Sequence, residues 1–306
     1  MRATTRLREL LAAGPTLFVP GCYNALSARI LEHVGFPAVY MTGYGTSMSL
    51  LGMPDAGLAT MSEMHLNARY IAAAVSVPVI ADADNGYGNA INVMRTVREY
   101  IQTGVAAIHI EDQVMPKRCG HVAGRRVIPL DEAVGKYRAA DQVRRESDPD
   151  FVIIARTDTC RALGLEEAAL RINAAADVGA DLGLLFPRSL EEAEKAVKAC
   201  RLPLVYVQSR GNRDGRPIIP RKELEQMGYV GCIEAQVVLC SALHYVRDML
   251  KELRETGDYT GMTQKEWVAS RQEVEDLISL TEFYEIEAQT VEARQKPDAA
   301  TNNGKR

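Results

Sequence analysis

One short stretch of the chain combines residue types that can do acid/base chemistry: Lys117-Arg118-Cys119-Gly120-His121. A thiol between cations and a histidine, on a loop that contains glycine, is expected to have a lowered pKa and an accessible sulfur. The loop follows an apolar run that ends in Glu111-Asp112, so it begins just beyond the carboxyl end of a predicted strand. Cys119 is therefore a candidate acid/base or nucleophile. The alternative is a solvated basic loop that happens to contain a cysteine.

Polar residues also follow three other apolar runs. The turn Thr42–Ser47 can offer backbone N–H groups to an oxyanion. Asp82 and Asp84 alternate along a strand end, which puts both carboxylates on one side, and such hard oxygen ligands suit Mg²⁺. Arg156 could hold a substrate carboxylate through two parallel hydrogen bonds. Each group is a weak signal alone, whereas four groups at consecutive strand ends indicate a binding site.

Eight short apolar runs must position these groups, and they alternate with segments of helical periodicity. Continuous rather than alternating hydrophobicity is typical of strands buried on both faces. The expected strands are Leu17–Pro20, Ala38–Met41, Val77–Ala81, Ala106–Ile110, Phe151–Ala155, Leu182–Phe186, Leu204–Val207 and Val230–Ile233. A repeated strand–helix order of this kind predicts an α/β fold, a (β/α)8 TIM-type barrel, with its active site at the carboxyl ends of the strands.

Two long amphipathic segments, Val237–Glu255 and Gln264–Thr290, follow the eighth expected strand. They exceed what a barrel needs to close, so we expect extra C-terminal helices that pack on a neighbouring subunit, with packing on their own barrel as the alternative. The expected organisation is a catalytic barrel over residues 1–255, a helical extension over 256–292 and a disordered tail over 293–306.

Composition excludes several classes of protein. A net charge of -4 argues against a general nucleic-acid binder, which needs a basic face. The sequence contains neither an apolar run long enough for a membrane span nor a signal-peptide core at its start, so a soluble cytoplasmic protein without membrane partners is expected. Six cysteines in 306 residues are too sparse for a disulfide framework.

Four segments together resemble the isocitrate lyase and phosphoenolpyruvate mutase superfamily, and most of all the 2-methylisocitrate lyases and related dicarboxylate lyases. The segments are Tyr40–Asp55 (YMTGYGTSMSLLGMPD), Val79–Gly88 (VIADADNGYG), Ile108–His121 (IHIEDQVMPKRCGH) and Phe151–Asp158 (FVIIARTD). The resemblance implies a barrel whose last helix is exchanged between subunits, a homotetramer, and Mg²⁺ as the cofactor, with Mn²⁺ as a substitute.

The resemblance also implies roles for individual residues. Asp84 would bind Mg²⁺ directly, and Asp55, Asp82 and Glu111 would hold its water shell. Arg156 would bind a substrate carboxylate, and Cys119 would be the acid/base on a mobile loop. The remaining residues that the resemblance assigns to the site are Tyr40 as a catalytic residue and Thr42, Gly43, Tyr44, Gly120 and His121 as residues that bind substrate.

Two positions depart from the family pattern. Phe186-Pro187-Arg188 stands where the related lyases have Phe-x-Glu, and Arg210 lies where they carry an acid after an asparagine. If both arginines point inward they bind substrate and change the charge of the pocket by about four units. If they point to solvent, the ordinary family substrates remain candidates.

The combined pattern predicts an enzyme, a Mg²⁺-dependent carbon–carbon lyase. Its substrate would be a small-molecule carboxylate, a 2-hydroxy di- or tricarboxylate cleaved through an enolate to a 2-oxo acid and a second carboxylate. A decarboxylase or hydrolase of oxaloacetate-like acids is the alternative within enzymes. A catalytically inactive barrel that binds a metabolite is the alternative outside them.

Overall fold

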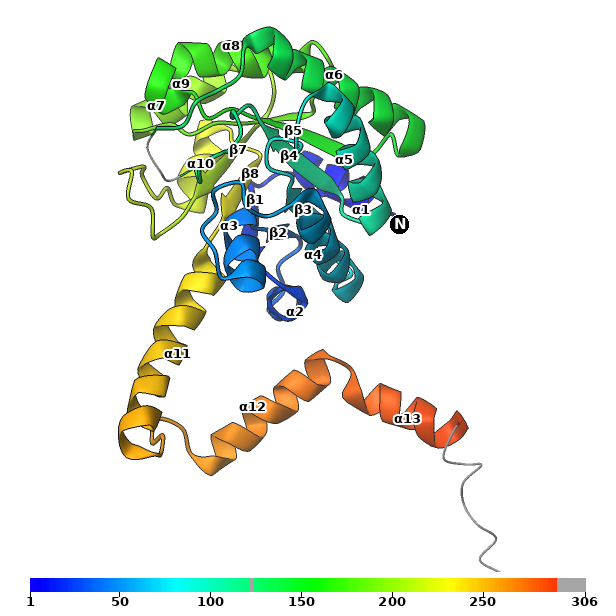
Figure 1. Ribbon diagram of the computed structural model, residues 1–306, viewed down its shortest axis with the longest axis vertical. Helices are drawn as coiled ribbons and strands as arrows, with labels where there is room; N and C mark the ends of the chain where they lie inside the picture. Colours follow the sequence, from blue (N-terminus) through cyan, green and yellow to red (C-terminus); the bar gives the residue numbers. More distant parts are fainter. Residues whose placement is uncertain (121–123, 291–306) are drawn as a thin grey trace, which may run out of the picture. The chain divides into compact units, whose positions relative to one another are not determined.

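The computed structural model describes residues 1–120 and 124–290. The chain divides into two compact units, Met1–His244 and a second that begins at Tyr245, and each is described here by itself. Figure 1 shows the elements of both units, coloured along the sequence.

Eight parallel strands form a closed barrel in the first unit, in the order β1 to β8 (Figure 1). Closure is made by the pairing of β1 with β8, in which Leu17 lies opposite Gly231. The strands are β1 Leu17–Cys22, β2 Val39–Met41, β3 Val79–Asp82, β4 Ala107–Glu111, β5 Val152–Arg156, β6 Leu182–Leu184, β7 Leu204–Gln208 and β8 Gly231–Glu234. The predicted TIM-type barrel is therefore confirmed, with each strand at its expected place.

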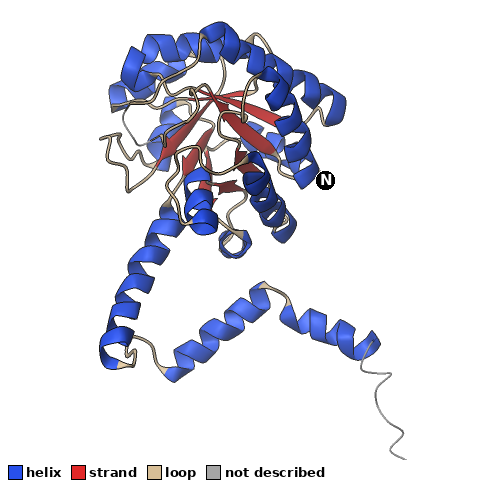
Figure 2. Ribbon diagram, viewed as in Figure 1, coloured by secondary structure: helices blue, strands red, loops and turns tan. Residues whose placement is uncertain are grey.

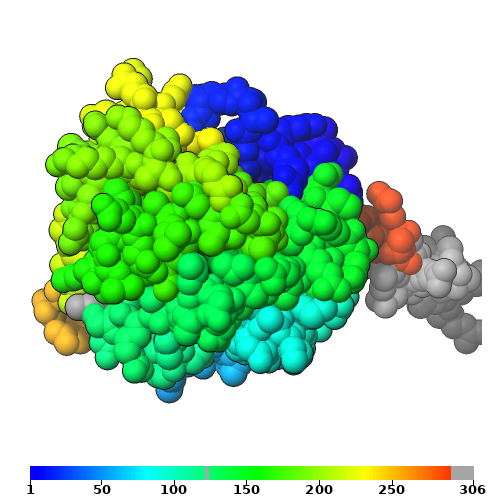
Figure 3. Space-filling model, turned by 90° about the horizontal axis from the view of Figure 1, so that it is seen from above, coloured from blue at the N-terminus to red at the C-terminus, as the bar shows by residue number. Residues whose placement is uncertain are grey.

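Helices surround these strands (Figure 2), and the larger ones coincide with the predicted segments. They are α2 Ala25–His33, α4 Met61–Ala74, α5 Ala90–Thr103, α6 Leu130–Ser147, α8 Leu165–Ala176 and α9 Leu190–Ala199. In the space-filling view the green helices α6 and α8 form one continuous surface (Figure 3). Short helices that the periodicity did not indicate are α3 Gly43–Thr46, η1 Ser47–Leu51, α7 Cys160–Leu163 and α10 Arg221–Met227.

Two apolar layers hold the barrel together. One fills its interior with side chains such as Leu17, Ile80 and Ile154, and the other lies between the strands and the surrounding helices. The unpredicted helix α1 (Ala3–Ala12) contributes the fully buried Leu7 to the interior layer, and so packs against the strands' interior side chains. The opposite end, where the strands finish, is thereby left for polar groups.

The C-terminal region contains α11 (Val237–Thr256), α12 (Gln264–Leu277) and α13 (Leu280–Thr290). The single helix expected over Gln264–Thr290 is interrupted, because Ser279 takes a left-handed backbone conformation with φ 58°. None of the residues of α11, α12 and α13 is buried in this structure. The boundaries expected at 255 and 292 stay predictions, and the expected tail lies outside the described residues. Within the described part of the chain, no helix is both long and apolar enough to cross a membrane.

Candidate active site

A cluster of carboxylates lies where β3 and β4 end. Asp82 closes β3, Glu111 closes β4, Asp84 follows two residues after Asp82, and all three are buried. Oδ1 of Asp82 accepts a hydrogen bond of 2.9 Å from the backbone N–H of Asp84, which has a left-handed φ of 46°. Asp55 brings a fourth carboxylate from the loop after η1. The structure thus brings together all four residues that the sequence assigns to the metal; we call them the acid cluster.

Tyr40 and His109 border the acid cluster on its β2 and β4 side. The Tyr40 hydroxyl lies 2.8 Å from Nε2 of His109 and donates a longer hydrogen bond of 3.4 Å to Asp82. Burial lowers the pKa of His109 to about 4, with Asp82 opposing the shift, so the imidazole is neutral near pH 7. A neutral His109 can donate from one ring nitrogen and accept at the other, and thereby fixes the orientation of Tyr40.

The ammonium of Lys117 lies inside the acid cluster. Its Nζ is 2.7 Å from Oδ1 of Asp84 and also forms an ion pair with Asp55. As the side chains stand, no three His, Cys, Asp or Glu residues within 1–120 and 124–290 are arranged to hold a metal ion. The donor set nevertheless fits Mg²⁺, because it consists of hard carboxylate oxygens. Oδ1 of Asp84 and both oxygens of Glu111 are buried without a hydrogen bond of good geometry in the described structure.

The carboxylates of the acid cluster differ in their electrostatics, because burial disfavours the charged form of Asp82 but nearby positive charge lowers its pKa to about 2. Burial raises the pKa of Asp84, and the charges of Asp82 and Asp55 raise it further against the opposing effect of Lys117. Burial also raises the pKa of Glu111 well above its ordinary value, although Arg156 opposes the rise. Two cationic side chains, Lys117 and Arg156, thus face four carboxylates, and a bound divalent cation would add the positive charge that favours the ionised forms of Asp84 and Glu111.

Arg156, at the end of β5, connects the acid cluster to a second group of charges. Its Nη2 lies 2.8 Å from Oε2 of Glu111, and its Nε donates a 3.0 Å hydrogen bond to Asp158. Asp158 in turn accepts a 2.5 Å hydrogen bond from the buried Arg125. A guanidinium held from two sides in this way has its donors fixed in direction before any ligand binds.

The ring of Phe186 carries three guanidinium groups at the same end of the barrel. The central carbons of Arg125, Arg156 and Arg216 lie 5.4, 5.0 and 4.5 Å from the ring centre. Gly120 approaches so closely that a Cβ atom there would lie 3.2 Å from both Arg156 and Phe186. The predicted substrate residue Gly120 is thus adjacent to the predicted carboxylate-binding residue Arg156.

The turn after β2 lies against the acid cluster. Thr42 caps α3, because its hydroxyl accepts a 3.3 Å hydrogen bond from the backbone of Gly45. A Cβ atom at Gly43 would collide with the carboxylate of Asp82, so only glycine allows this approach. Burial raises the pKa of Tyr44, and the thiol of Cys119 contributes to the rise, which places these two side chains near each other.

Cys119 is buried in this structure, on a loop whose base is fixed by Gln113. The Gln113 side chain donates to the carbonyl of Arg118 at 2.8 Å and accepts from its N–H at 3.0 Å. The lowered thiol pKa that the sequence predicts for Cys119 stays a prediction. His121, which was also predicted to bind substrate, lies outside the described residues.

The two arginines that depart from the family pattern lie outside these charge clusters. Arg188 forms a 2.5 Å ion pair with Glu192 on α9, and 53% of its side chain is exposed. The Arg210 side chain is 68% exposed, with Nε 3.6 Å from Glu234, whose Oε1 accepts the Arg210 backbone N–H. In this structure neither guanidinium is brought to Arg156.

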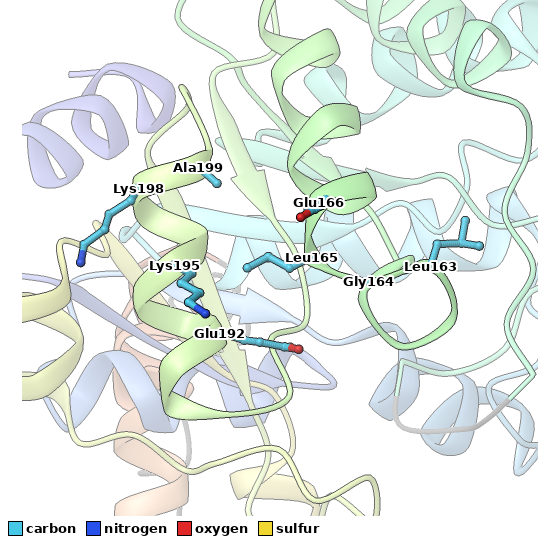
Figure 4. Close-up of a pocket in the computed structure, with 8 residues that line it drawn as sticks. All are labelled: Leu163, Gly164, Leu165, Glu166, Glu192, Lys195, Lys198 and Ala199. Atoms are coloured by element: carbon cyan, nitrogen blue, oxygen red, sulfur yellow. The ribbon is translucent and has the colours of Figure 1, made fainter.

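A surface pocket of about 680 Å³ lies apart from the acid cluster, between the α7–α8 turn and α9 (Figure 4). Glu192 and Lys195 line it from α9, and Leu163 and Leu165 line it from the turn. Its lining contains none of the residues that the sequence assigned to the site.

Sequence reasoning does not assign four charged residues that the structure places at the site: Lys117, Arg125, Asp158 and Arg216. Lys117 was read only as a cation that acts on the neighbouring thiol. Asp158 stands in the quoted Arg-Thr-Asp motif, which was the one available signal for it. For Arg125 no signal existed, because its partner Asp158 is 33 residues away.

An eight-stranded parallel barrel with charged side chains gathered where its strands end has the arrangement of a TIM-barrel enzyme, a class whose active sites lie at that end. Residues 7–254 match the phosphoenolpyruvate phosphomutase family. The chain belongs to this family, the phosphoenolpyruvate mutase and isocitrate lyase superfamily, which confirms the family and the enzyme class predicted from its motifs.

Three similar proteins illustrate the range of this family. The 2,3-dimethylmalate lyase of Eubacterium barkeri is 41% identical over 94% of this chain and 98% of its own length. Oxaloacetate acetylhydrolase in complex with 3,3-difluorooxalacetate is 38% identical, with a TM-score of 0.87 over 94% of this chain and 96% of its own. Phosphonopyruvate hydrolase in complex with oxalate and Mg²⁺ is 29% identical, with a TM-score of 0.83 over 95% of this chain and 100% of its own.

Proposed function

We propose that this chain is a Mg²⁺-dependent carbon–carbon lyase. Its substrate would be a 2-hydroxy di- or tricarboxylate of the substituted-malate or 2-methylisocitrate type, and its products a 2-oxo acid and a second carboxylate. One observation carries the proposal: Glu111 belongs to the acid cluster and also contacts Arg156 at 2.8 Å. A substrate with two carboxylates could therefore place one beside a cation in the cluster and the other on Arg156. The dimethylmalate lyase relative supports this substrate class.

The acid cluster would hold the metal, with Asp84 as the direct ligand and Asp55, Asp82 and Glu111 around it. When bound, Mg²⁺ would supply positive charge for the carboxylate and the 2-oxygen of the substrate. The phosphonopyruvate hydrolase structure with oxalate and Mg²⁺ supports this part of the proposal, because oxalate presents the same pair of neighbouring oxygens.

The chain's own residues would move the protons. A carboxylate of the acid cluster takes the proton of the 2-hydroxyl group, the 2-oxygen becomes a carbonyl, and the adjacent carbon–carbon bond breaks. The electron pair stays on the carbon next to the second carboxylate, and the Cys119 thiol donates a proton to that carbon. Burial raises the pKa of Tyr40 well above its ordinary value, with Asp82 adding to the rise, so Tyr40 stays protonated. Its hydroxyl would turn from Asp82, which it contacts at 3.4 Å, to donate a hydrogen bond to the 2-oxygen.

The test is a substrate screen with Mg²⁺ present, using 2,3-dimethylmalate, 2-methylisocitrate, citramalate, isocitrate and oxaloacetate. Release of a 2-oxo acid from one of the 2-hydroxy acids is the expected result, and both EDTA and the Asp84→Ala substitution should abolish it. If no 2-hydroxy acid is cleaved while oxaloacetate is consumed, the lyase proposal is wrong.

Hydrolysis of oxaloacetate is the second candidate function, because a structure of that specificity superimposes with a TM-score of 0.87. The same cation and oxyanion groups would serve, but water would attack the carbonyl next to the bond that breaks. The products then differ: hydrolysis gives oxalate and acetate, decarboxylation gives pyruvate and CO₂, and a lyase leaves oxaloacetate intact. Product analysis on oxaloacetate therefore separates the candidates.

We also propose a homotetramer in which the C-terminal helices are exchanged between subunits. Leu243, Val246, Leu250 and Leu253 form one apolar stripe along α11, spaced three and four residues apart, and all four are exposed. An apolar stripe of this length on a helix is typical of a surface that another subunit covers.

A further inference from the structure

A buried ion pair lies behind the active site, between the strands and helix α8. Asp112 follows Glu111, and because side chains alternate along a strand it points away from the barrel interior. Its Oδ2 lies 3.2 Å from Nη1 of Arg171 on α8, and only 1% of the Asp112 side chain and 8% of the Arg171 side chain are exposed. Burial removes both charges from water, and apolar side chains of similar volume often stabilise a core as well or better. Stability alone therefore does not account for this pair.

The Asp112 carboxylate holds the segment that carries Arg156. Its Oδ2 accepts a 2.7 Å hydrogen bond from the Thr157 hydroxyl, and its Oδ1 accepts one of 3.1 Å from the backbone N–H of Asp158. The backbone N–H of Asp112 donates to the carbonyl of Arg156 at 3.2 Å. One residue after β4 thus contacts each of the three consecutive residues at the end of β5.

Asp158 passes this restraint on to the guanidinium of Arg156. The Arg156 Nε donates a 3.0 Å hydrogen bond to the Asp158 carboxylate, so the direction of the guanidinium depends on where Asp158 lies. Donors that are fixed before a ligand binds lower the entropic cost of binding it. A displaced Asp158 would therefore weaken the binding of a carboxylate at Arg156.

Arg171 fixes the Asp112 carboxylate from the side of α8. Its Nη1 donates to Oδ2 of Asp112 and, at 2.9 Å, to the carbonyl of Ile128, while its Nε donates to Glu167 at 2.8 Å. Burial raises the pKa of Asp112, whereas the hydrogen bond from Thr157 and the charge of Arg171 oppose the rise. Loss of Arg171 would leave a buried carboxylate without its cation and without one of the contacts that hold it in place.

We propose that Arg171 is a positioning residue: through Asp112 and Asp158 it fixes the direction in which the Arg156 guanidinium meets a substrate carboxylate. Arg171 itself does not touch the substrate. This inference rests on the proposed function, in which Arg156 binds a substrate carboxylate. It adds that the affinity for that carboxylate is set in part by a side chain of α8, behind the strands.

The first test separates KM from kcat for the acid that the wild-type protein consumes in the substrate screen. Arg171→Met removes the charge and three hydrogen bonds, so KM should rise at least about 10-fold while kcat stays within about 3-fold. Arg171→Lys should keep KM within about 3-fold of wild type, because the bonds to Asp112 and Ile128 come from one nitrogen atom, which an ammonium can replace. A KM within 2-fold of wild type in Arg171→Met overturns the inference.

Arg144 on α6 supplies the matched control. It is also a buried arginine, 12% exposed, and it forms ion pairs with Asp141 and with Asp181, which precedes β6 at the end of the barrel opposite the active site. Arg144→Met should lower the unfolding temperature as Arg171→Met does, but should leave KM within about 2-fold of wild type. An equal rise of KM in both variants would show that loss of any buried arginine weakens substrate binding, and would overturn the specific role of Arg171.

Thr157→Val tests the same path if Arg171→Met fails to fold, because it keeps the shape of the side chain and leaves the ion pair in place. It removes the hydroxyl that joins the Arg156 segment to Asp112, so KM should rise at least about 3-fold, whereas Thr157→Ser keeps the hydroxyl and should not change KM. An unchanged KM in Thr157→Val overturns the inference.

The second readout needs no turnover: crystal structures, without substrate, of the wild-type protein and of Arg171→Met, or of Thr157→Val if Arg171→Met does not fold. The Arg156 guanidinium should lose its hydrogen bond to Asp158 in the variant, and a guanidinium that keeps this bond and its direction overturns the inference. If the guanidinium moves but no 2-hydroxy acid is cleaved by the wild type, the proposed function fails alone. If a 2-hydroxy acid is cleaved and the guanidinium does not move, the positioning role fails alone.

Discussion

Glu111 and Arg156 lie opposite each other in the register of β4 and β5, and Nη2 of Arg156 is 2.8 Å from Oε2 of Glu111. The pairing of two neighbouring strands thus fixes the distance between the acid cluster and the guanidinium. A substrate that spans both would meet donors and acceptors that the backbone has already placed.

Arg156→Lys should therefore raise KM for the true substrate at least about 10-fold. A planar guanidinium can contact Glu111, Asp158 and a substrate carboxylate at the same time, whereas a compact ammonium cannot. Steady-state kinetics on the best substrate of the screen measure it. Arg161→Lys, on the exposed surface of α7, is the control. A KM within twofold of wild type would show that Arg156 has only a structural role.

Asp84→Ala should abolish Mg²⁺-dependent activity and leave the fold intact. The carboxylate lies at the functional end of the barrel rather than in either apolar layer, and burial raises its pKa, so a bound cation would stabilise its charged form. Calorimetric Mg²⁺ titration and thermal unfolding give the two readouts, with the exposed Asp131→Ala as control. Unchanged Mg²⁺ affinity in Asp84→Ala would mean that the metal ligand lies elsewhere.

Cys119→Ser should lower turnover at least about 100-fold with little change in substrate binding, since a hydroxyl has a much higher pKa than a thiol and is a poor proton donor to carbon. Single-turnover rates and product inhibition separate the two effects, and Cys240→Ser serves as the matched cysteine control. Near-normal turnover would reduce Cys119 to a loop residue and favour the hydrolase or decarboxylase.

Arg188→Ala should change KM less than about 2-fold for every substrate. Its guanidinium pairs with Glu192 and is half-exposed, and solvent screens a surface ion pair of this kind so that it contributes little. Comparison with Arg156→Lys on the same substrates is the measurement. A rise of 10-fold or more that is confined to substrates with an extra carboxylate would show that Arg188 turns into the pocket when substrate binds.

The barrel was predictable because strands buried on both faces appear as continuous apolar runs, and eight of them alternate with segments of helical periodicity. Helix α1 was not predicted, because its polar residues obscure the apolar periodicity around Leu7. Helix α10 was not predicted, because seven residues are too few to show a helical period. The break between α12 and α13 was not predicted, because the apolar periodicity continues through Ser279. The left-handed backbone conformation of Ser279 leaves no trace in a hydrophobic pattern.

The candidate site was predictable where a strand end fixes a side chain, as for Asp82, Glu111 and Arg156. Contacts between loops carry no such signal. Lys117 and Asp55 are 62 residues apart, and their pairing follows only from the packing of two loops on the barrel. The position of Arg188, where the related lyases carry an acid, suggested that it could enter the pocket. The sequence alone does not show that Arg188 pairs with Glu192, four residues later.

The apolar stripe of α11 makes the last prediction. Val246 and Leu250 are 48% and 49% exposed, so burying the exposed half of each against another subunit would contribute roughly 0.7 to 1.5 kcal/mol per side chain. Val246→Gln/Leu250→Gln should therefore lower the molecular mass in solution below that of a tetramer, measured by light scattering over a range of concentrations. Arg247→Gln/Lys251→Gln is the control: it places the same new residue type on the same helix and should leave the mass unchanged, because these charged side chains remain in water.

A tetramer that persists in Val246→Gln/Leu250→Gln would show that this stripe is not the contact between subunits. An active monomer of the wild-type protein would show that the exchange of helices does not occur.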